Sequence, residues 1–173
     1  MVYDTTVAIV RSLFSIMRLS TSLVLIISLS ISLVGIERSY GEVSVTVSIR
    51  PLRLIAQAIV EDRGTVHSIV DFQGSPHNYS LTPTDRINMQ QADLLLRVSP
   101  EFEIFLADIF ASQSRSKPLI TAASISGISL HNLDDGNADL HLWLNTENAI
   151  SIAQQLAISL IGLDPENEKE YQE

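Results

Sequence analysis

From residue 42 onward, β-type and helix-type sequence patterns alternate, and this alternation constrains the fold more than any other feature of the chain. In residues 42–48 (EVSVTVS), valines alternate with polar residues, which is the two-residue period of a strand. Pro51 then begins a stretch in which apolar residues recur at helical spacing as far as Gly64. The first unit is therefore predicted to be one strand followed by one helix.

The same pattern then repeats along the chain. Strands are predicted at residues 65–70, 94–98 and 118–121, and helices at residues 85–92 and 101–111. Such alternation implies parallel strands that are joined by right-handed crossover helices. We therefore predict an α/β fold with an open, mainly parallel, doubly wound sheet flanked by helices. In this architecture, ligands bind beyond the carboxyl ends of the strands.

Residues with the chemistry of helix termini mark where two helices begin. Thr82 and Asp85 have the spacing of a capping box, with Pro83 at the first helical position. Asn145 is the expected cap of a long helix that Gly162 should end. The predicted buried face of that helix consists of Ile150, Ala153, Leu156, Ala157 and Leu160.

The N-terminal segment has the pattern of a secretory signal peptide. Arg11 and Arg18 precede an apolar run over residues 22–36, and small residues follow at positions 39–41. We expect cleavage after Gly41. The alternative is an uncleaved membrane anchor, but the run contains four serines and is shorter than the roughly 20 apolar residues that cross a bilayer.

Composition limits the chemistry that the chain can carry. There is no cysteine, so disulfides, thiolate metal sites and a lipid-modified cysteine are excluded, and any metal must be bound by nitrogen and oxygen. The chain has 11 Lys and Arg against 20 Asp and Glu, a net charge of −9. Nucleic acid is not an expected partner, because phosphate binding needs clustered basic residues.

Two of the four histidines lie in settings that suit a ligand. His77 follows the second predicted strand in a loop rich in turn residues, which is the carboxyl-end position. His141 lies in Asp139–Leu144, where extended geometry would place it on the same face as Trp143. Histidine is the commonest metal ligand, but pattern alone does not separate a ligand from a surface residue.

Five motifs together carry a resemblance to a known family. In order along the chain, they are SIRPLRLIAQAI (48–59), GSPHNYSLTPTD (74–85), QADLL (91–95), EFEIFL (101–106) and DLHLWL (139–144). This set resembles the substrate-binding proteins of zinc and manganese ABC transporters, over residues 43–164. The tripeptide at residues 79–81 (YSL) favours the zinc-specific branch.

The resemblance implies that His77 and His141 are two imidazole ligands from the N-terminal lobe to a metal in the cleft between two lobes. The implied function is capture of Zn²⁺ in the periplasm and its delivery to the membrane permease of an ABC transporter, with Mn²⁺ as the alternative metal. Asn78 and Asn145-Thr146 depart from the family pattern, which often has an acidic residue and Asp-Pro or Ser-Pro there. Because Asn145 can still cap a helix, we expect this change to be mild.

The expected organisation is a signal peptide at residues 1–41, an N-terminal metal-binding α/β lobe at residues 42–163, and the start of the inter-lobe helix at residues 164–173. The second lobe is expected to be absent from this chain. The family's remaining protein ligands usually come from that lobe, so transport is expected to be impaired. A truncated product without transport activity is the competing interpretation.

Two histidines leave two positions of a tetrahedral zinc site open. Asp139 is a candidate for one of them, or for the oxygen that accepts the second N–H of a metal-bound histidine. His131 lies where relatives often carry a metal-gathering loop and is a weaker candidate, whereas His67 is expected to be a packed or edge histidine. An enzyme is not expected, since the chain has no H-E-x-x-H, Walker or G-x-S-x-G motif.

Overall fold

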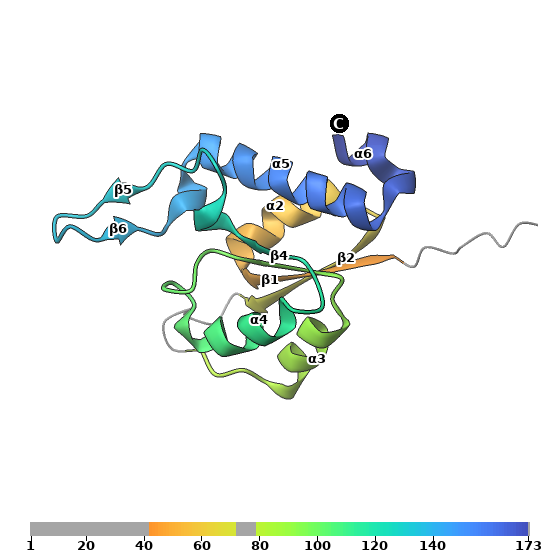
Figure 1. The fold of residues 1–173 in the computed structure, drawn as a ribbon, viewed down its shortest axis with the longest axis horizontal. Coiled ribbons are helices and arrows are strands. Elements are labelled where there is room, and N and C mark those ends of the chain that lie inside the picture. Colours follow the sequence, from red (N-terminus) through yellow and green to blue (C-terminus); the bar gives the residue numbers. More distant parts are fainter. Residues whose placement is uncertain (1–41, 72–78, 173) are drawn as a thin grey trace, which may run out of the picture. The chain divides into compact units, whose positions relative to one another are not determined.

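The structure is a computed structural model that describes residues 42–71 and 79–172 (Figure 1). The predicted signal peptide and His77 lie outside the described residues. Within the described part of the chain, none of the helices combines the length and apolar character needed to span a membrane.

The fold is built on a four-stranded sheet with the order β2-β1-β3-β4, in which every neighbouring pair is parallel. The strands are β1 (Val43–Ile49), β2 (Gly64–Val70), β3 (Leu94–Arg97) and β4 (Leu119–Thr121). All four were predicted to within one or two residues. The prediction of an open, parallel α/β sheet flanked by helices is therefore confirmed.

Helices cover both faces of this sheet. Figure 1 shows α2 (Arg50–Val60) and α5 (Thr146–Leu163) on one face, and α3 (Pro83–Gln91) and α4 (Ala107–Gln113) on the other. The chain continues beyond α5 through a 3₁₀ turn to α6 (Glu168–Gln172). The predicted capping box at the start of α3 is present, with Thr82 and Asp85 each accepting a hydrogen bond from the other's backbone nitrogen.

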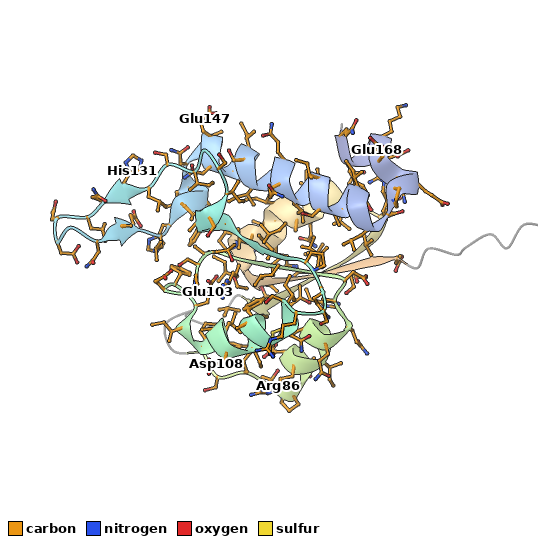
Figure 2. All side chains as sticks on the ribbon, viewed as in Figure 1. Arg86, Glu103, Asp108, His131, Glu147 and Glu168 are labelled. Atoms are coloured by element: carbon orange, nitrogen blue, oxygen red, sulfur yellow. The ribbon has the colours of Figure 1, made fainter. Side chains whose placement is uncertain are left out.

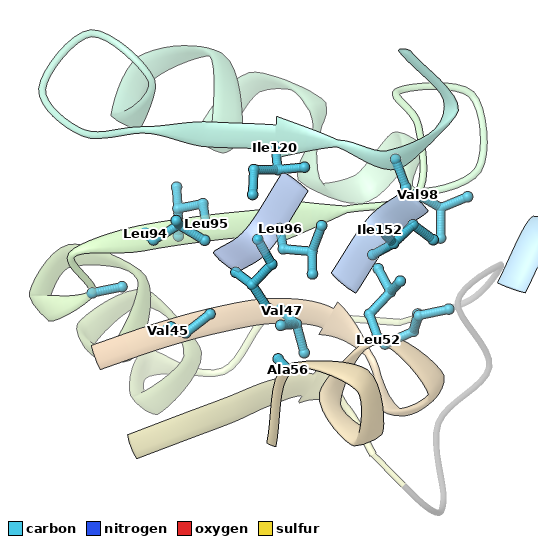
Figure 3. Packing of buried hydrophobic residues seen from close by; sticks show 14 of the residues in the cluster. Val45, Val47, Leu52, Ala56, Leu94, Leu95, Leu96, Val98, Ile120 and Ile152 are labelled. Carbon is cyan, nitrogen blue, oxygen red and sulfur yellow. The ribbon is translucent and has the colours of Figure 1, made fainter. Parts of the chain in front are cut away.

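The core lies around the two central strands, which are buried on both faces. Val45 and Val47 of β1 and Leu94–Leu96 of β3 have no exposed surface (Figure 3). Leu52 of α2 and Ile152 of α5, which are also fully buried, pack over one side of these strands. The apolar run Leu94–Leu96 is typical of a parallel strand that helices cover on both sides, whereas in β1 the polar residues Thr46 and Ser48 are buried as well.

The predicted helix at residues 101–111 is wrong in its first six residues, because the α-helix spans Ala107–Gln113. A 3₁₀ turn at Ile104–Leu106 precedes α4, and Glu103 has a non-helical backbone with φ −112° and ψ 62°. The cause is the Glu103 side chain, which turns into the core and accepts backbone N–H groups of Val98 and Ser99. Helical periodicity does not reveal such a contact.

The predicted boundaries and buried face of α5 need correction as well. Gly162 lies inside the helix, which continues to Leu163, and Ile150 is 46% exposed. The buried positions are instead Asn148, Ile152, Leu156, Ala157 and Leu160. Because α5 carries apolar residues on several sides, its sequence pattern does not identify a single buried face.

A two-stranded hairpin occupies part of the segment that sequence patterns left irregular. Strands β5 (His131–Asn132) and β6 (Ala138–Asp139) pair antiparallel, with His131 directly opposite Asp139. Gly136 has φ 81° in the connecting turn, a conformation that glycine adopts without steric cost. The hairpin extends from the helical layer near the start of α5 (Figure 1).

Candidate metal site

Asp139 and His141 form a close pair at the end of the hairpin. The Asp139 Oδ1 atom lies 2.7 Å from Nδ1 of His141 and also accepts the His141 backbone N–H at 3.0 Å. This backbone hydrogen bond, and then the contact with the imidazole, lower the pKa of the Asp139 carboxyl. The carboxylate thus engages Nδ1, which leaves Nε2 as the nitrogen available to a metal.

The predicted extended geometry of this segment is wrong. Leu142–Leu144 forms a 3₁₀ turn, in which the backbone hydrogen bond from Leu144 N to His141 O is 3.1 Å long. The turn still brings the rings of His141 and Trp143 together, with centroids 5.3 Å apart. Trp143 therefore lies beside the imidazole, as expected, although the His141 side chain remains 52% exposed.

Phe102 supplies the third ring of this cluster. Its ring centroid lies 5.7 Å from that of His141 and 5.5 Å from that of Trp143, both in edge-on arrangements. Phe102 follows β3 and is 6% exposed. Its contact with His141 therefore joins the segment after the hairpin to the carboxyl end of the sheet. This is the edge where the fold predicts a ligand.

The segment that follows His77 packs on the same stretch of chain. Tyr79 is the first described residue after the gap, and its ring centroid lies 5.6 Å from that of Phe105. The Tyr79 hydroxyl donates to Oδ2 of Asp85 at 3.0 Å, and burial together with this bond raises the pKa of Tyr79. Residues 102–105 therefore contact both the His141 segment and the chain two residues after His77.

Asn148 of α5 ties the His141 segment to the start of the hairpin. Its side chain accepts the Ser129 N–H at 2.8 Å and donates to the Ser129 carbonyl at 2.8 Å and to the Leu142 carbonyl at 3.0 Å. Asn145 caps α5 as predicted, accepting from the backbone nitrogens of Glu147 and Asn148. The imidazole is thus held at the amino end of a long helix.

A pocket of about 270 Å³ opens beside the pair and is lined by His131, Asp139, His141 and Asn148, among others. Because His131 is one of the lining residues, it lies near the candidate site, although Figure 2 shows that it belongs to the hairpin. Over residues 42–71 and 79–172, however, no three His, Asp or Glu side chains are grouped to hold a metal ion. The described part of the site is therefore the Asp139–His141 pair.

The sequence comparison decides the family. A protein-family model described as ZnuA, zinc-uptake complex component A, periplasmic, matches residues 45–173. The chain belongs to this family. Its members include substrate-binding proteins of metal ABC transporters, which agrees with the resemblance that the five sequence motifs indicated.

Relatives of this chain are named as substrate-binding lipoproteins of metal ABC transporters, some of them for iron or manganese. The chain is 30% identical over 126 residues to the metal ABC transporter substrate-binding lipoprotein SsaB of Streptococcus sanguinis, covering 68% of this chain and 41% of that protein. It is 29% identical over 126 residues to the manganese ABC transporter substrate-binding lipoprotein PsaA of Streptococcus pneumoniae, with the same coverage. The chain thus spans less than half the length of these relatives.

A solved structure of a periplasmic metal-binding protein shows the same fold. The manganese-bound periplasmic metal-binding protein of candidatus Liberibacter asiaticus superposes with a TM-score of 0.66 at 29% identity, covering 75% of this chain and 49% of that one. The match supports the α/β sheet and its helices as a substrate-binding fold.

The remaining histidine considered in the sequence analysis of this ZnuA-family chain is His67. His67 lies on β2, an edge strand, and is exposed, as expected for an edge histidine. Sequence reasoning missed the roles of Phe102 and Asn148 in holding the His141 segment. The EFEIFL motif pointed to the right stretch of chain, but it did not show which side chains face the site.

Proposed function

We propose that this chain binds Zn²⁺ through His77 and His141, as the solute-binding component of a metal ABC transporter. The observation that carries this proposal is the Asp139–His141 pair. A carboxylate on Nδ1 is the partner that metal-binding histidines usually have, because it sets the tautomer and turns Nε2 toward the metal. Asp139 is therefore proposed as this orienting acceptor, with direct ligation as the alternative role.

His77 is proposed as the second imidazole ligand. In the sequence it comes two residues before Tyr79, and Tyr79 packs on Phe105, three residues after the Phe102 that contacts His141. Two imidazoles from neighbouring segments fill two of the four positions that zinc prefers. A lobe that supplies only these ligands is expected to bind zinc weakly.

Manganese is the alternative metal. A relative named for manganese and a manganese-bound structure match the chain as well as the other relatives do. Manganese prefers oxygen ligands more than zinc does, whereas the described half-site offers an imidazole. We therefore favour zinc.

The proposed partners and location follow from the same family. We propose that residues 1–41 are a cleaved signal peptide, that residues 42–163 form the metal-binding lobe in the periplasm, and that residues 164–173 begin the helix between lobes. Delivery of metal to a membrane permease is proposed for the whole protein, and the chain itself is proposed to be non-catalytic. N-terminal sequencing of the exported protein tests the cleavage after Gly41.

The decisive experiment is a zinc titration of the 173-residue chain against a competing chelator. His77→Ala and His141→Ala should each reduce zinc affinity, whereas His67→Ala, which removes an exposed histidine from β2, should leave it unchanged. Zinc binding that survives both site substitutions would rule out this half-site. A parallel titration with Mn²⁺ compares the two metals.

A further inference from the structure

Glu103 is a fully buried carboxylate at the carboxyl ends of the two central strands. Its Oε1 atom accepts the Val98 N–H at 2.9 Å and the hydroxyl of Ser48 at the end of β1, and its Oε2 atom accepts the Ser99 N–H at 2.9 Å. A buried carboxylate is tolerated only where hydrogen bonds replace water. Glu103 therefore joins the end of β1 to the loop that leaves β3.

The same loop is closed by two further hydrogen bonds. The Glu103 backbone N–H donates to the Ser99 carbonyl at 3.2 Å, and the Phe102 N–H donates to the Ser99 hydroxyl at 3.1 Å. Two sets of hydrogen bonds thus fix the backbone of the loop of residues 98–103. The N–H groups of Val98 and Ser99 donate to the Glu103 side chain, and the N–H groups of Phe102 and Glu103 donate to Ser99. Phe102 is held at the point where this loop meets the His141 segment.

We propose that Glu103 is a positioning residue for His141, acting through the loop of residues 98–103 and the ring of Phe102. Asp139 restrains one edge of the imidazole at Nδ1, and the edge-on contact with Phe102 restrains the tilt of the ring. Trp143 contacts both rings and completes the arrangement. The inference rests on the proposed function only in treating His141 as a metal ligand.

The physical benefit is preorganisation. An imidazole that already has its metal-bound orientation loses less side-chain freedom when the ion arrives, so the affinity is higher for the same ligands. The His141 side chain is 52% exposed, so the contacts with Asp139, Phe102 and Trp143 matter for its orientation. Glu103 itself lies in the core and is not proposed to touch the metal (Figure 2).

The first arm of the test needs no metal. Proton NMR of the 173-residue chain reports the ring signals of His141, which is assigned by comparison with His141→Ala, and of Trp143, the only tryptophan. Glu103→Gln and Phe102→Leu should each shift both sets of signals, since ring-current shifts depend on the aromatic geometry. Lys117→Met, which disturbs the amino-terminal edge of the sheet through α3, should leave them unchanged.

The second arm measures zinc affinity in a double-mutant cycle. Glu103→Gln should weaken zinc binding by about tenfold, the size expected when a residue that orients a ligand is lost, and should have no effect in the His141→Ala background. If His141→Ala does not change zinc affinity, the proposed function is wrong, and the NMR arm still decides whether Glu103 positions the ring.

Unchanged His141 and Trp143 signals in folded Glu103→Gln would overturn the inference. Should that variant fail to fold, Ser48→Ala decides alone, because it removes one hydrogen bond from Glu103 and keeps the rings of Phe102, His141 and Trp143. Unchanged His141 and Trp143 signals in folded Ser48→Ala would then overturn the inference.

Discussion

The Asp139 carboxylate holds the His141 imidazole in place, with one oxygen 2.7 Å from Nδ1 and 3.0 Å from the backbone nitrogen of the same residue. A single oxygen thus restrains both the ring and the backbone of the candidate ligand. The pair is local in sequence, but its orientation depends on the β5–β6 hairpin, in which Asp139 is paired with His131.

Asp139→Asn should lower the zinc affinity of the chain by about 10- to 100-fold without unfolding it, because an amide is a weaker acceptor and does not increase the basicity of the imidazole. Competition against a chelator measures the change. Asp134→Asn, which removes the same charge from the exposed tip of the hairpin, is the matched control. An equal loss in both variants would mean that net charge, and not the hydrogen bond, attracts the metal.

Zinc binding should be weaker at pH 5 than at pH 7.5, because histidine side chains bind metal only in the neutral form. The sign follows from competition between the proton and the ion for the same nitrogen. Zinc titrations at pH 7.5 and pH 5 measure the difference, which should shrink in His141→Ala because one competing imidazole is gone. Affinity that is independent of pH would point to carboxylate ligands.

Asn148→Ala should destabilise the fold by about 1–3 kcal/mol, since it leaves the buried Leu142 carbonyl without its partner and removes two part-buried hydrogen bonds to Ser129. Urea denaturation measures the free energy of unfolding. Thr146→Ala, on the exposed first turn of the same helix, should change it much less. Stability equal to that of the wild type would mean that water replaces the Asn148 contacts.

Lys117→Met should also destabilise the fold by about 1–3 kcal/mol, but it should leave zinc affinity unchanged. The Lys117 ammonium donates to the carbonyls of Met89, Gln90 and Ala92 at the carboxyl end of α3, where a cation also favours the helix dipole. Denaturation and zinc titration are measured on the same sample. Arg115→Met removes an exposed cation nearby and is the charge-matched control.

The strands and their helices were predictable because their signals are local. The valines of β1 alternate within seven residues, and Thr82 reaches Asp85 three residues away, so neighbouring letters contain the information. The break before α4 was not predictable, because the Glu103 side chain leaves the helical path and turns into the core, where it accepts the Val98 and Ser99 N–H groups and the hydroxyl of Ser48, 55 residues away. Nothing in the helical period of residues 101–111 reports those contacts.

The candidate site shows the same division. The histidines His77 and His141 were visible in the sequence, and the five motifs suggested metal-ligand roles for them by resemblance, which stay a prediction. The arrangement of Phe102 against His141 was not, since it joins segments that are 39 residues apart and meet only when the sheet has formed. The extended backbone that the sequence pattern predicted for Leu142–Leu144 was also wrong, because this segment forms a 3₁₀ turn.

Glu103 should give the fold a pH dependence of its own. Burial raises the pKa of this carboxyl, although hydrogen bonds from Ser48, Val98 and Ser99 oppose the shift. Between the unfolded value of about 4.3 and the raised folded value, the folded state binds more protons than the unfolded state. The contribution of Glu103 to stability should therefore decrease as the pH rises through that window and be constant above it.

The comparison that isolates this effect is the free energy of unfolding of the wild type relative to Glu103→Gln, measured between pH 4 and pH 7 in urea. The difference should be largest at the acidic end and should fall toward neutral pH, by about 1.4 kcal/mol for each unit by which the pKa is raised. A difference that grows toward neutral pH would show that the hydrogen bonds outweigh burial and hold the carboxylate ionised. In that case the loop of residues 98–103 would be anchored by a charge.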